Sequence, residues 1–110
     1  MSTPVVVING FTVPVKEAEQ FLERWSETAR VMAGQPGMVR ARLHRSLIAD
    51  AQPLFVNVAE WESREALNQA LAVPEFGGST QRILNDPDLH VTPHPVLYEV
   101  VLDVEPQTPS

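Results

Sequence analysis

The sequence predicts an α+β domain whose elements follow in the order strand, helix, strand, strand, helix, strand. Four stretches are rich in β-branched residues and either alternate or stay continuously apolar, as strands do. Between them lie two stretches in which apolar residues recur at helical spacing, and glycine and proline separate the elements. This order is the split βαβ pattern of a ferredoxin-like sandwich, in which helices cover one face of a four-stranded sheet.

In the first half of the chain, a continuously apolar stretch typical of a strand is followed by apolar residues at helical spacing. Residues 4–13, PVVVINGFTV, are almost continuously apolar and predict a strand. The GQPG segment at 34–37 ends the following helix with glycine and proline. That helix begins near Val15, and its apolar positions are Ala18, Phe21, Leu22, Trp25, Ala29 and Met32.

The second half predicts two strands, a helical region and a final strand. Residues 48–53 form a turn, and Ser63 is typical of a helix N-cap. Residues 85–95, NDPDLHVTPHP, are rich in aspartate and proline and are expected to form a loop. The elements expected around these signals are strands at 38–47, 54–61 and 96–104 and helices at 64–72 and 74–84.

Composition restricts the class of protein. A chain of 110 residues makes one domain, which we place at residues 1–105, with a flexible tail at 106–110. The net charge is −6 and the chain has one lysine, which argues against nucleic acid as a partner. There is no cysteine, no apolar run of the roughly 20 residues that cross a bilayer, and no signal-peptide pattern at the amino terminus. We therefore expect a cytoplasmic protein without a membrane partner.

Both faces of the predicted sheet are apolar. Two helices can cover only one face, and a face that met water would alternate with polar residues. Instead, residues 5–8 supply apolar side chains to both faces of the first strand, and the third and last strands do the same. A second apolar face needs a partner, and the simplest partner is another copy of the chain. We expect a homodimer in which two sheets pack face to face.

The strongest functional candidate is an asparagine in the third predicted strand, FVNVAEW. Alternation places Phe55, Asn57, Ala59 and Trp61 on one face of that strand. An amide among aromatic residues must find a hydrogen-bond partner or cost free energy. Asn57 and Trp61 could therefore aim an amide and an indole N–H into a cavity. The alternative is a structurally paired amide beside a core tryptophan.

Asn9 interrupts the first strand as Asn57 interrupts the third, and in this topology the two strands are antiparallel neighbours. Asn9 shares a face with Val7 and Phe11. Two amides on adjacent central strands favour a polar spot in an apolar pocket, which is the usual composition of a small-molecule site. The alternatives are a hydrogen bond between the two amides or a bulge at the NG pair.

His44 is the candidate for an ionisable catalytic group, because a histidine can take up a proton at neutral pH. It lies near Arg42 and Arg45, which could attract an anionic phenolate. An edge strand that carries charges against aggregation explains the same pattern.

The DPDLHVTPH segment holds two acids and two histidines, a composition that suggests metal ligands. Pro93 denies the helical geometry that would place His90 and His94 on one side, so we expect no metal site. The sequence also contains no Ser-His-Asp elbow, phosphate loop or dinucleotide fingerprint. We therefore expect no cofactor.

The segments PGMVRARLHRSL, FVNVAEWES and PEF, in this order, resemble the antibiotic biosynthesis monooxygenase family, and VVVINGFTV fits the same pattern. The resemblance runs from Val5 to Val104 and implies a dimeric α/β barrel. In the cofactor-free branch of the family, small enzymes oxidise phenols or anthrones to quinones with O2 alone. An asparagine and a tryptophan four residues later lie in their pocket and match Asn57 and Trp61. The resemblance implies a cofactor-independent monooxygenase whose partners are a small aromatic substrate and O2.

The resemblance is incomplete at the remaining site positions. The cofactor-free branch places a tyrosine where this chain has Leu67, and its helix arginine corresponds only loosely to Arg82. Asn57 would hydrogen-bond the enolate oxygen as charge develops, and His44 is our hypothesis for the proton acceptor. The substrate-binding residues that we expect are Asn9, Phe11, Phe55, Leu67 and Arg82.

A haem-degrading branch of the same family gives the main alternative. It pairs a first-strand asparagine, matched by Asn9, with a tryptophan and a histidine in the second helical region. Those two positions fall at about Ala70 and Thr80, neither of which can ligate iron. The alternatives to the oxygenase are thus a haem-binding or haem-oxidising enzyme and a non-catalytic binding dimer.

Overall fold

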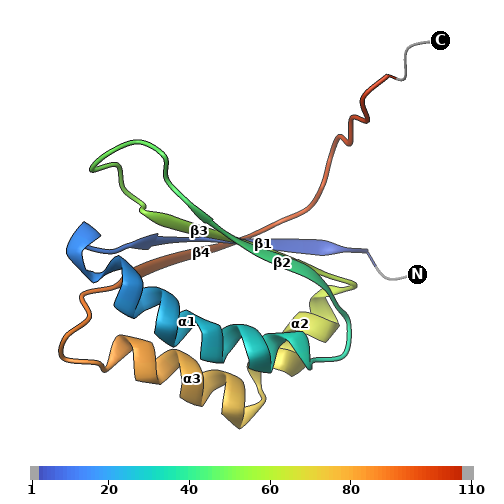
Figure 1. Ribbon diagram of the computed structural model, residues 1–110. Coiled ribbons are helices and arrows are strands. Elements are labelled where there is room, and N and C mark those ends of the chain that lie inside the picture. Colours follow the sequence, from blue (N-terminus) through green and yellow to red (C-terminus); the bar gives the residue numbers. More distant parts are fainter. Residues whose placement is uncertain (1–2, 108–110) are drawn as a thin grey trace.

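The computed structural model describes residues 3–107 and consists of a four-stranded antiparallel sheet with helices on one face (Figure 1). The elements are β1 (Val5–Thr12), the 3-10 turn η1 (Val15–Glu17), α1 (Ala18–Ala33), β2 (Met38–Arg45), β3 (Phe55–Trp61), α2 (Arg64–Leu71), α3 (Pro74–Leu84) and β4 (Thr92–Tyr98). The strand order is β2-β3-β1-β4, so β1 and β3 are central and β2 and β4 lie at the edges. The predicted ferredoxin-like α+β fold is confirmed.

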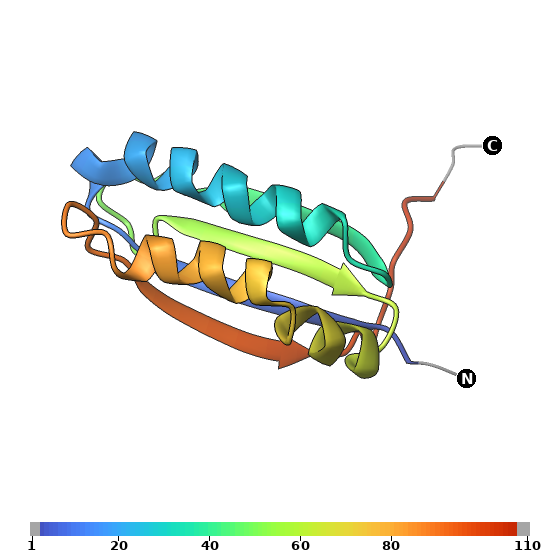
Figure 2. The same ribbon diagram turned by 90° about the horizontal axis from the view of Figure 1, so that it is seen from below.

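The three helices lie on the same side of the sheet, with α1 beside α3 and α2 near the end of β3 (Figure 2). Ser63 caps α2 as predicted, because its hydroxyl accepts a hydrogen bond from the backbone N–H of Ala66 at 3.0 Å. Gly37, with a φ of 83°, carries the turn from α1 to β2. A Cβ at that position would lie 2.5 Å from the Cβ of Ala66, so the turn can pass this close to α2 only with glycine.

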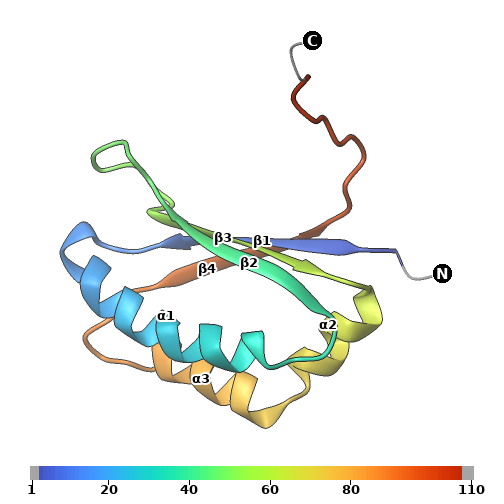
Figure 3. The same cartoon turned by 45° about the vertical axis from the view of Figure 1, so that its right-hand side comes forward.

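Strand pairing brings the two asparagines together in the middle of the sheet. The strands β1 and β3 lie side by side in the middle of the sheet (Figure 3). In their antiparallel register, Asn9 is opposite Asn57, and Val5 and Phe11 are opposite Trp61 and Phe55. Side chains on one face of a pair of strands are neighbours at such positions. The helix-facing side of the sheet therefore carries the two amides in its middle, with Trp61 towards one end of the strands and Phe11 and Phe55 towards the other.

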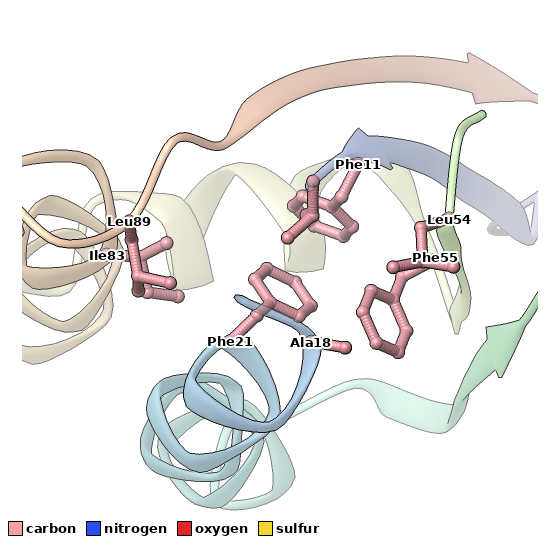
Figure 4. Packing of buried hydrophobic residues seen from close by; sticks show 8 residues of the cluster. Phe11, Ala18, Phe21, Leu54, Phe55, Ile83 and Leu89 are labelled. Carbon is pink, nitrogen blue, oxygen red and sulfur yellow. The ribbon is translucent and has the colours of Figure 1, made fainter. Parts of the chain in front are cut away.

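Two clusters of buried apolar residues hold the helices on the sheet. At one end Phe21 of α1 stacks on Phe55 with ring centroids 4.8 Å apart and contacts Phe11 at 5.1 Å (Figure 4). Aromatic pairs at these distances stabilise a core beyond their buried area. The cluster at the other end consists of Met32, Ala59, Trp61, Leu67, Ala70 and Phe76.

The prediction of the last strand at 96–104 is wrong, because β4 begins earlier and ends at Tyr98. Pro93 and Pro95 made this region resemble a loop, yet both lie within β4. Proline is tolerated in an edge strand, where its missing N–H can face away from the sheet. Beyond Tyr98 the chain leaves the sheet, and residues 100–104 are exposed (Figure 1).

The ends of the chain complete the description. Of the predicted tail at 106–110, residues 108–110 lie outside the described residues, as do residues 1–2. The domain boundary expected at residue 105 stays a prediction. None of the helices within residues 3–107 is long and apolar enough to cross a membrane.

Candidate functional site

A cavity of about 380 Å³ lies between the helices and the sheet. Strands β1, β3 and β4 form its wall on the sheet side, and α1, α2 and α3 form the opposite wall. The residues that line it are mostly aliphatic and aromatic. Pockets for small molecules typically measure roughly 300 to 1,000 Å³ and combine apolar walls with a few polar groups. The cavity thus has the size and the composition of a site for a small apolar ring compound.

Asn57 places an unpaired amide in this cavity. Its side chain is 4% exposed, and Oδ1 has no hydrogen-bond partner among the described residues. The neighbouring Asn9 uses its own Oδ1 to accept a hydrogen bond from the backbone N–H of His94 at 3.0 Å. A hydrogen bond between the two amides was the alternative expected from the sequence. Asn57 Oδ1 takes part in no such bond. A buried acceptor in this state costs free energy unless a ligand or water supplies a donor.

Trp61 and Leu67 form the end wall of the cavity. Trp61 is the last residue of β3 and is 1% exposed, and Leu67 packs against it from α2. Leu67 stands where the resemblance places a tyrosine, so this wall lacks that hydroxyl. Asn9 and Phe11 line the floor from β1. The structure thus brings these four predicted site residues together with Asn57.

Three other predicted site residues lie away from the cavity. Phe55 is buried in the cluster around Phe21. Arg82 is exposed on α3, and its Nε donates to Glu27 Oε2 at 3.1 Å. His44 is exposed on the edge strand β2, with Nδ1 3.2 Å from the carbonyl oxygen of Val56.

The register explains the position of His44. In the pairing of β2 with β3, Leu43 is opposite Asn57, whereas His44 is opposite Val56. His44 therefore points to the face of the sheet that the helices leave open. Among the cavity-lining residues that the structure describes, none has an ionisable carboxyl, imidazole, amine or guanidinium group.

Thr28 is a cavity residue that the sequence reasoning missed. It lies on α1 in line with Trp25 and Met32, is 2% exposed, and its Oγ1 has no hydrogen-bond partner within residues 3–107. The signal was present, because a polar residue interrupts the apolar stripe of this helix as Asn57 interrupts its strand. The cavity therefore contains two buried polar side chains with unpaired atoms, one from the sheet and one from α1.

A second, more open hollow runs between α1 and β2. It shares Trp25, Met32 and Asn57 with the cavity and is bounded on the β2 side by Met38 and Leu43. Asn57 thus borders the space on both sides of α1.

The loop from α3 to β4 is anchored at Glu17. The backbone N–H of His90 donates to Glu17 Oε1 at 2.6 Å, and His90 Nδ1 lies 2.9 Å from Glu17 Oε2. The backbone hydrogen bond is the main reason why the pKa of Glu17 lies below its ordinary value. This anchor positions Val91, which lines the cavity.

Within residues 3–107, no three His, Asp or Glu side chains gather in a way that could hold a metal ion.

Fold and site together define a small ferredoxin-like domain with an apolar cavity between its helices and its sheet. The sequence model of the antibiotic biosynthesis monooxygenase family matches residues 4–79, which is more than half of the chain. This chain therefore belongs to the antibiotic biosynthesis monooxygenase family. Among curated proteins, none matches the chain significantly.

Solved structures show the range of activities among similar proteins. SnoaB, a cofactor-independent oxygenase from Streptomyces nogalater, is 31% identical, with a TM-score of 0.78 over 94% of this chain and 98% of that one. A candidate monooxygenase from Shewanella loihica PV-4 is 32% identical, with a TM-score of 0.73 over 94% and 99% of the two chains. A heme-degrading protein from Mycobacterium tuberculosis is 25% identical, with a TM-score of 0.68 over 96% and 100%. Because these activities differ, the fold alone does not define the reaction.

Proposed function

We propose that this protein is a cofactor-independent monooxygenase that oxidises phenolic, anthrone or quinol-type small molecules to quinones with O2. The observation that carries the proposal is the unpaired amide of Asn57 in an apolar cavity. The similarity to SnoaB, an oxygenase that needs no cofactor, supports it. We propose Asn57 and Trp61 as the catalytic residues, with Asn9, Phe11 and Leu67 as residues that hold the ring.

The reaction balances with the substrate and O2 alone. An anthrone loses a proton from its CH2 carbon and a phenol loses the proton of its hydroxyl, and in either anion the ring carbon carries an electron pair. That pair reduces O2 to a peroxide bound to the carbon, and the peroxide takes up a proton to become the hydroperoxide. Loss of water from the hydroperoxide leaves the new C=O group, so one oxygen atom enters the quinone and the other leaves as water. No external reductant is required.

The amide of Asn57 can hydrogen-bond the substrate both before and after the substrate loses its proton. Its Oδ1 accepts a hydrogen bond from the hydroxyl of the neutral substrate, and its NH2 group donates to the oxygen that becomes negative in the enolate. A donor aimed at developing charge in an apolar cavity is worth about 3 to 4 kcal/mol of barrier height. Trp61 packs against the ring and adds an indole N–H.

The proton acceptor in this proposal is water. The cavity walls hold no ionisable side chain among the described residues, and His44 is on the opposite face of the sheet. Electron-rich anthrones and quinols are acidic enough that an enzyme can promote their ionisation by stabilising the anion. Asn57 thus promotes ionisation by stabilising the anion, while water takes the proton that His44 was expected to accept.

The test is O2 uptake by metal-free protein with a panel of anthrones and hydroquinones, after subtraction of autoxidation in buffer. Asn57→Ala should lower the rate about a hundred- to a thousandfold, and Trp61→Phe should lower it as well. His44→Ala serves as the control outside the cavity and should leave the rate unchanged. Saturable uptake that is the same in wild type and Asn57→Ala would contradict the proposal.

Haem chemistry is the second candidate, because the chain is also 25% identical to a heme-degrading protein. The residues present do not fit haem, since the described cavity walls hold no histidine to ligate iron. Thr80 lines the cavity at one of the positions where a ligand would be expected. Titration with hemin should therefore give no sharp Soret band, and a stoichiometric band would favour this candidate over the oxygenase.

We further propose that the protein is a homodimer. The open face of the sheet carries Val6, Ile8, Val56 and Val58, which are apolar and at most partly exposed. The segment at 100–104, which runs away from the sheet on the side opposite the helices (Figure 1), carries further exposed apolar residues. Val58→Asp should shift the mass measured by sedimentation equilibrium from two chains to one, and an unchanged mass would contradict packing through this face. The cytoplasmic location expected from the sequence stays a prediction.

A further inference from the structure

Thr28 differs from the other hydroxyl residues of the helices. Ser26 donates to the carbonyl of Leu22 at 2.9 Å, and both Ser79 and Thr80 donate to the carbonyl of Phe76, at 2.9 and 3.1 Å. Serine and threonine within helices commonly satisfy themselves on their own helix in this way. Thr28 is 2% exposed and its hydroxyl has no partner within residues 3–107.

We propose that Thr28 is a substrate-positioning residue that binds a ring hydroxyl of the ligand while Asn57 binds the oxygen of the reacting ring. Thr28 lines the cavity from helix α1 and Asn57 lines it from strand β3, so the two side chains reach the ligand from opposite sides. The inference rests on the proposed function for the identity of the ligand. It specifies a narrower substrate class, namely aromatic rings with at least two oxygen substituents.

The free-energy balance points to binding rather than to folding. A buried hydroxyl without a partner destabilises the folded state by about 1 to 3 kcal/mol, whereas valine of the same shape would not. A residue that lowers stability where a conservative replacement would not is typical of a functional site. A hydroxyl can both donate and accept, so it can pair with a ring hydroxyl in either protonation state.

Three variants test the proposal. Thr28→Val removes the unpaired hydroxyl and keeps the shape, and Thr28→Ser keeps the hydroxyl. Thr80→Val is the matched control, because Thr80 lines the same cavity but its hydroxyl already donates to the carbonyl of Phe76. The probes are 1,8-dihydroxyanthraquinone and anthraquinone, which differ only in the two ring hydroxyls. Quenching of tryptophan fluorescence reports binding, since Trp25 and Trp61 line the cavity.

We expect Thr28→Val to weaken binding of the dihydroxy compound about three- to tenfold, as the loss of one neutral hydrogen bond does. Its affinity for anthraquinone should stay unchanged, and the Tm of the ligand-free protein should rise. Thr28→Ser should bind both probes like wild type. Thr80→Val should show no selective loss of the dihydroxy compound.

Either of two results would overturn the proposal. One is an equal change in affinity for both probes, or no change, which would show that Thr28 contacts no ring hydroxyl. The other is a lower Tm in Thr28→Val, which would assign the hydroxyl a structural role. Binding is measured without turnover, so absence of O2 uptake would refute the oxygenase and leave this result intact, whereas failure of wild type to bind either probe would refute the ligand class.

Discussion

Partly filling the cavity from the sheet side should stabilise the protein and weaken ligand binding. Ala59 lies between Asn57 and Trp61 on the cavity side of β3 and is 2% exposed. Ala59→Leu would place three additional carbon atoms into a space of about 380 Å³, which has room for them. Each buried methylene contributes about 0.8 kcal/mol, so the free energy of unfolding should rise by at most about 2 kcal/mol. That gain corresponds to an increase in Tm of up to about 8 °C.

The same substitution in the filled core gives a matched control. Ala70 is also 2% exposed and belongs to the same apolar cluster as Ala59, but unlike Ala59 it does not line the cavity. Ala70→Leu should therefore overpack the core and cost about 1 to 3 kcal/mol. Thermal unfolding monitored by circular dichroism, together with binding of 1,8-dihydroxyanthraquinone, tests both variants. A drop in Tm for Ala59→Leu similar to that for Ala70→Leu would refute the presence of open space beside Asn57.

Three further predictions follow from the site and its supports. The pKa of Glu17 is lowered, so its contribution to stability is fully present at neutral pH and is lost as the pH falls below about 4.5 and through the folded-state pKa. In urea unfolding, the difference in the free energy of unfolding between wild type and Glu17→Gln should therefore become smaller in this pH range. A difference that becomes larger would contradict the anchoring of His90. The pH profile of kcat/KM should be the same in wild type and in His44→Ala, because His44 lies outside the cavity, whereas a profile that changes in that variant would identify His44 as the base. Ser63→Ala should destabilise the protein by about 1 kcal/mol through loss of the α2 cap, measured as a shift in the denaturation midpoint with kcat unaffected.

Most of the fold could be predicted from the sequence because two periodicities carry it. Alternation in β2 and β3 and helical spacing in α1 reflect burial on one face, and that burial determines each element. The last strand escaped this reasoning because two prolines interrupt it. A proline signals a loop unless the strand lies at an edge, and edge position depends on the strand order of the whole sheet.

The site was predictable where it depended on alternation within one strand. Asn57 and Trp61 share a face, and the pairing of Asn9 with Asn57 follows from the topology. His44 could not be placed in this way, because the sequence shows two alternating sets in β2 but not which set faces the helices. That choice depends on the register of β2 against β3, where Leu43 is opposite Asn57.

Thr28 was missed for a different reason. A single polar residue in an apolar helical stripe is common, and it usually bonds to its own helix, as Ser79 and Thr80 do. Only the three-dimensional contacts show that the hydroxyl of Thr28 lacks such a partner. Unpaired atoms at Thr28 and Asn57 are properties of the packed cavity rather than of local sequence.

The most direct test of the central claim is to follow the oxygen atoms. Metal-free protein should be incubated under 18O2 with an anthrone, and the quinone product analysed by mass spectrometry. We predict one 18O atom per quinone at a rate well above the buffer reaction, with that excess lost in Asn57→Ala. A quinone without label, or a labelled product formed equally fast by Asn57→Ala, would show that this cavity does not direct O2 to an enolate held by Asn57.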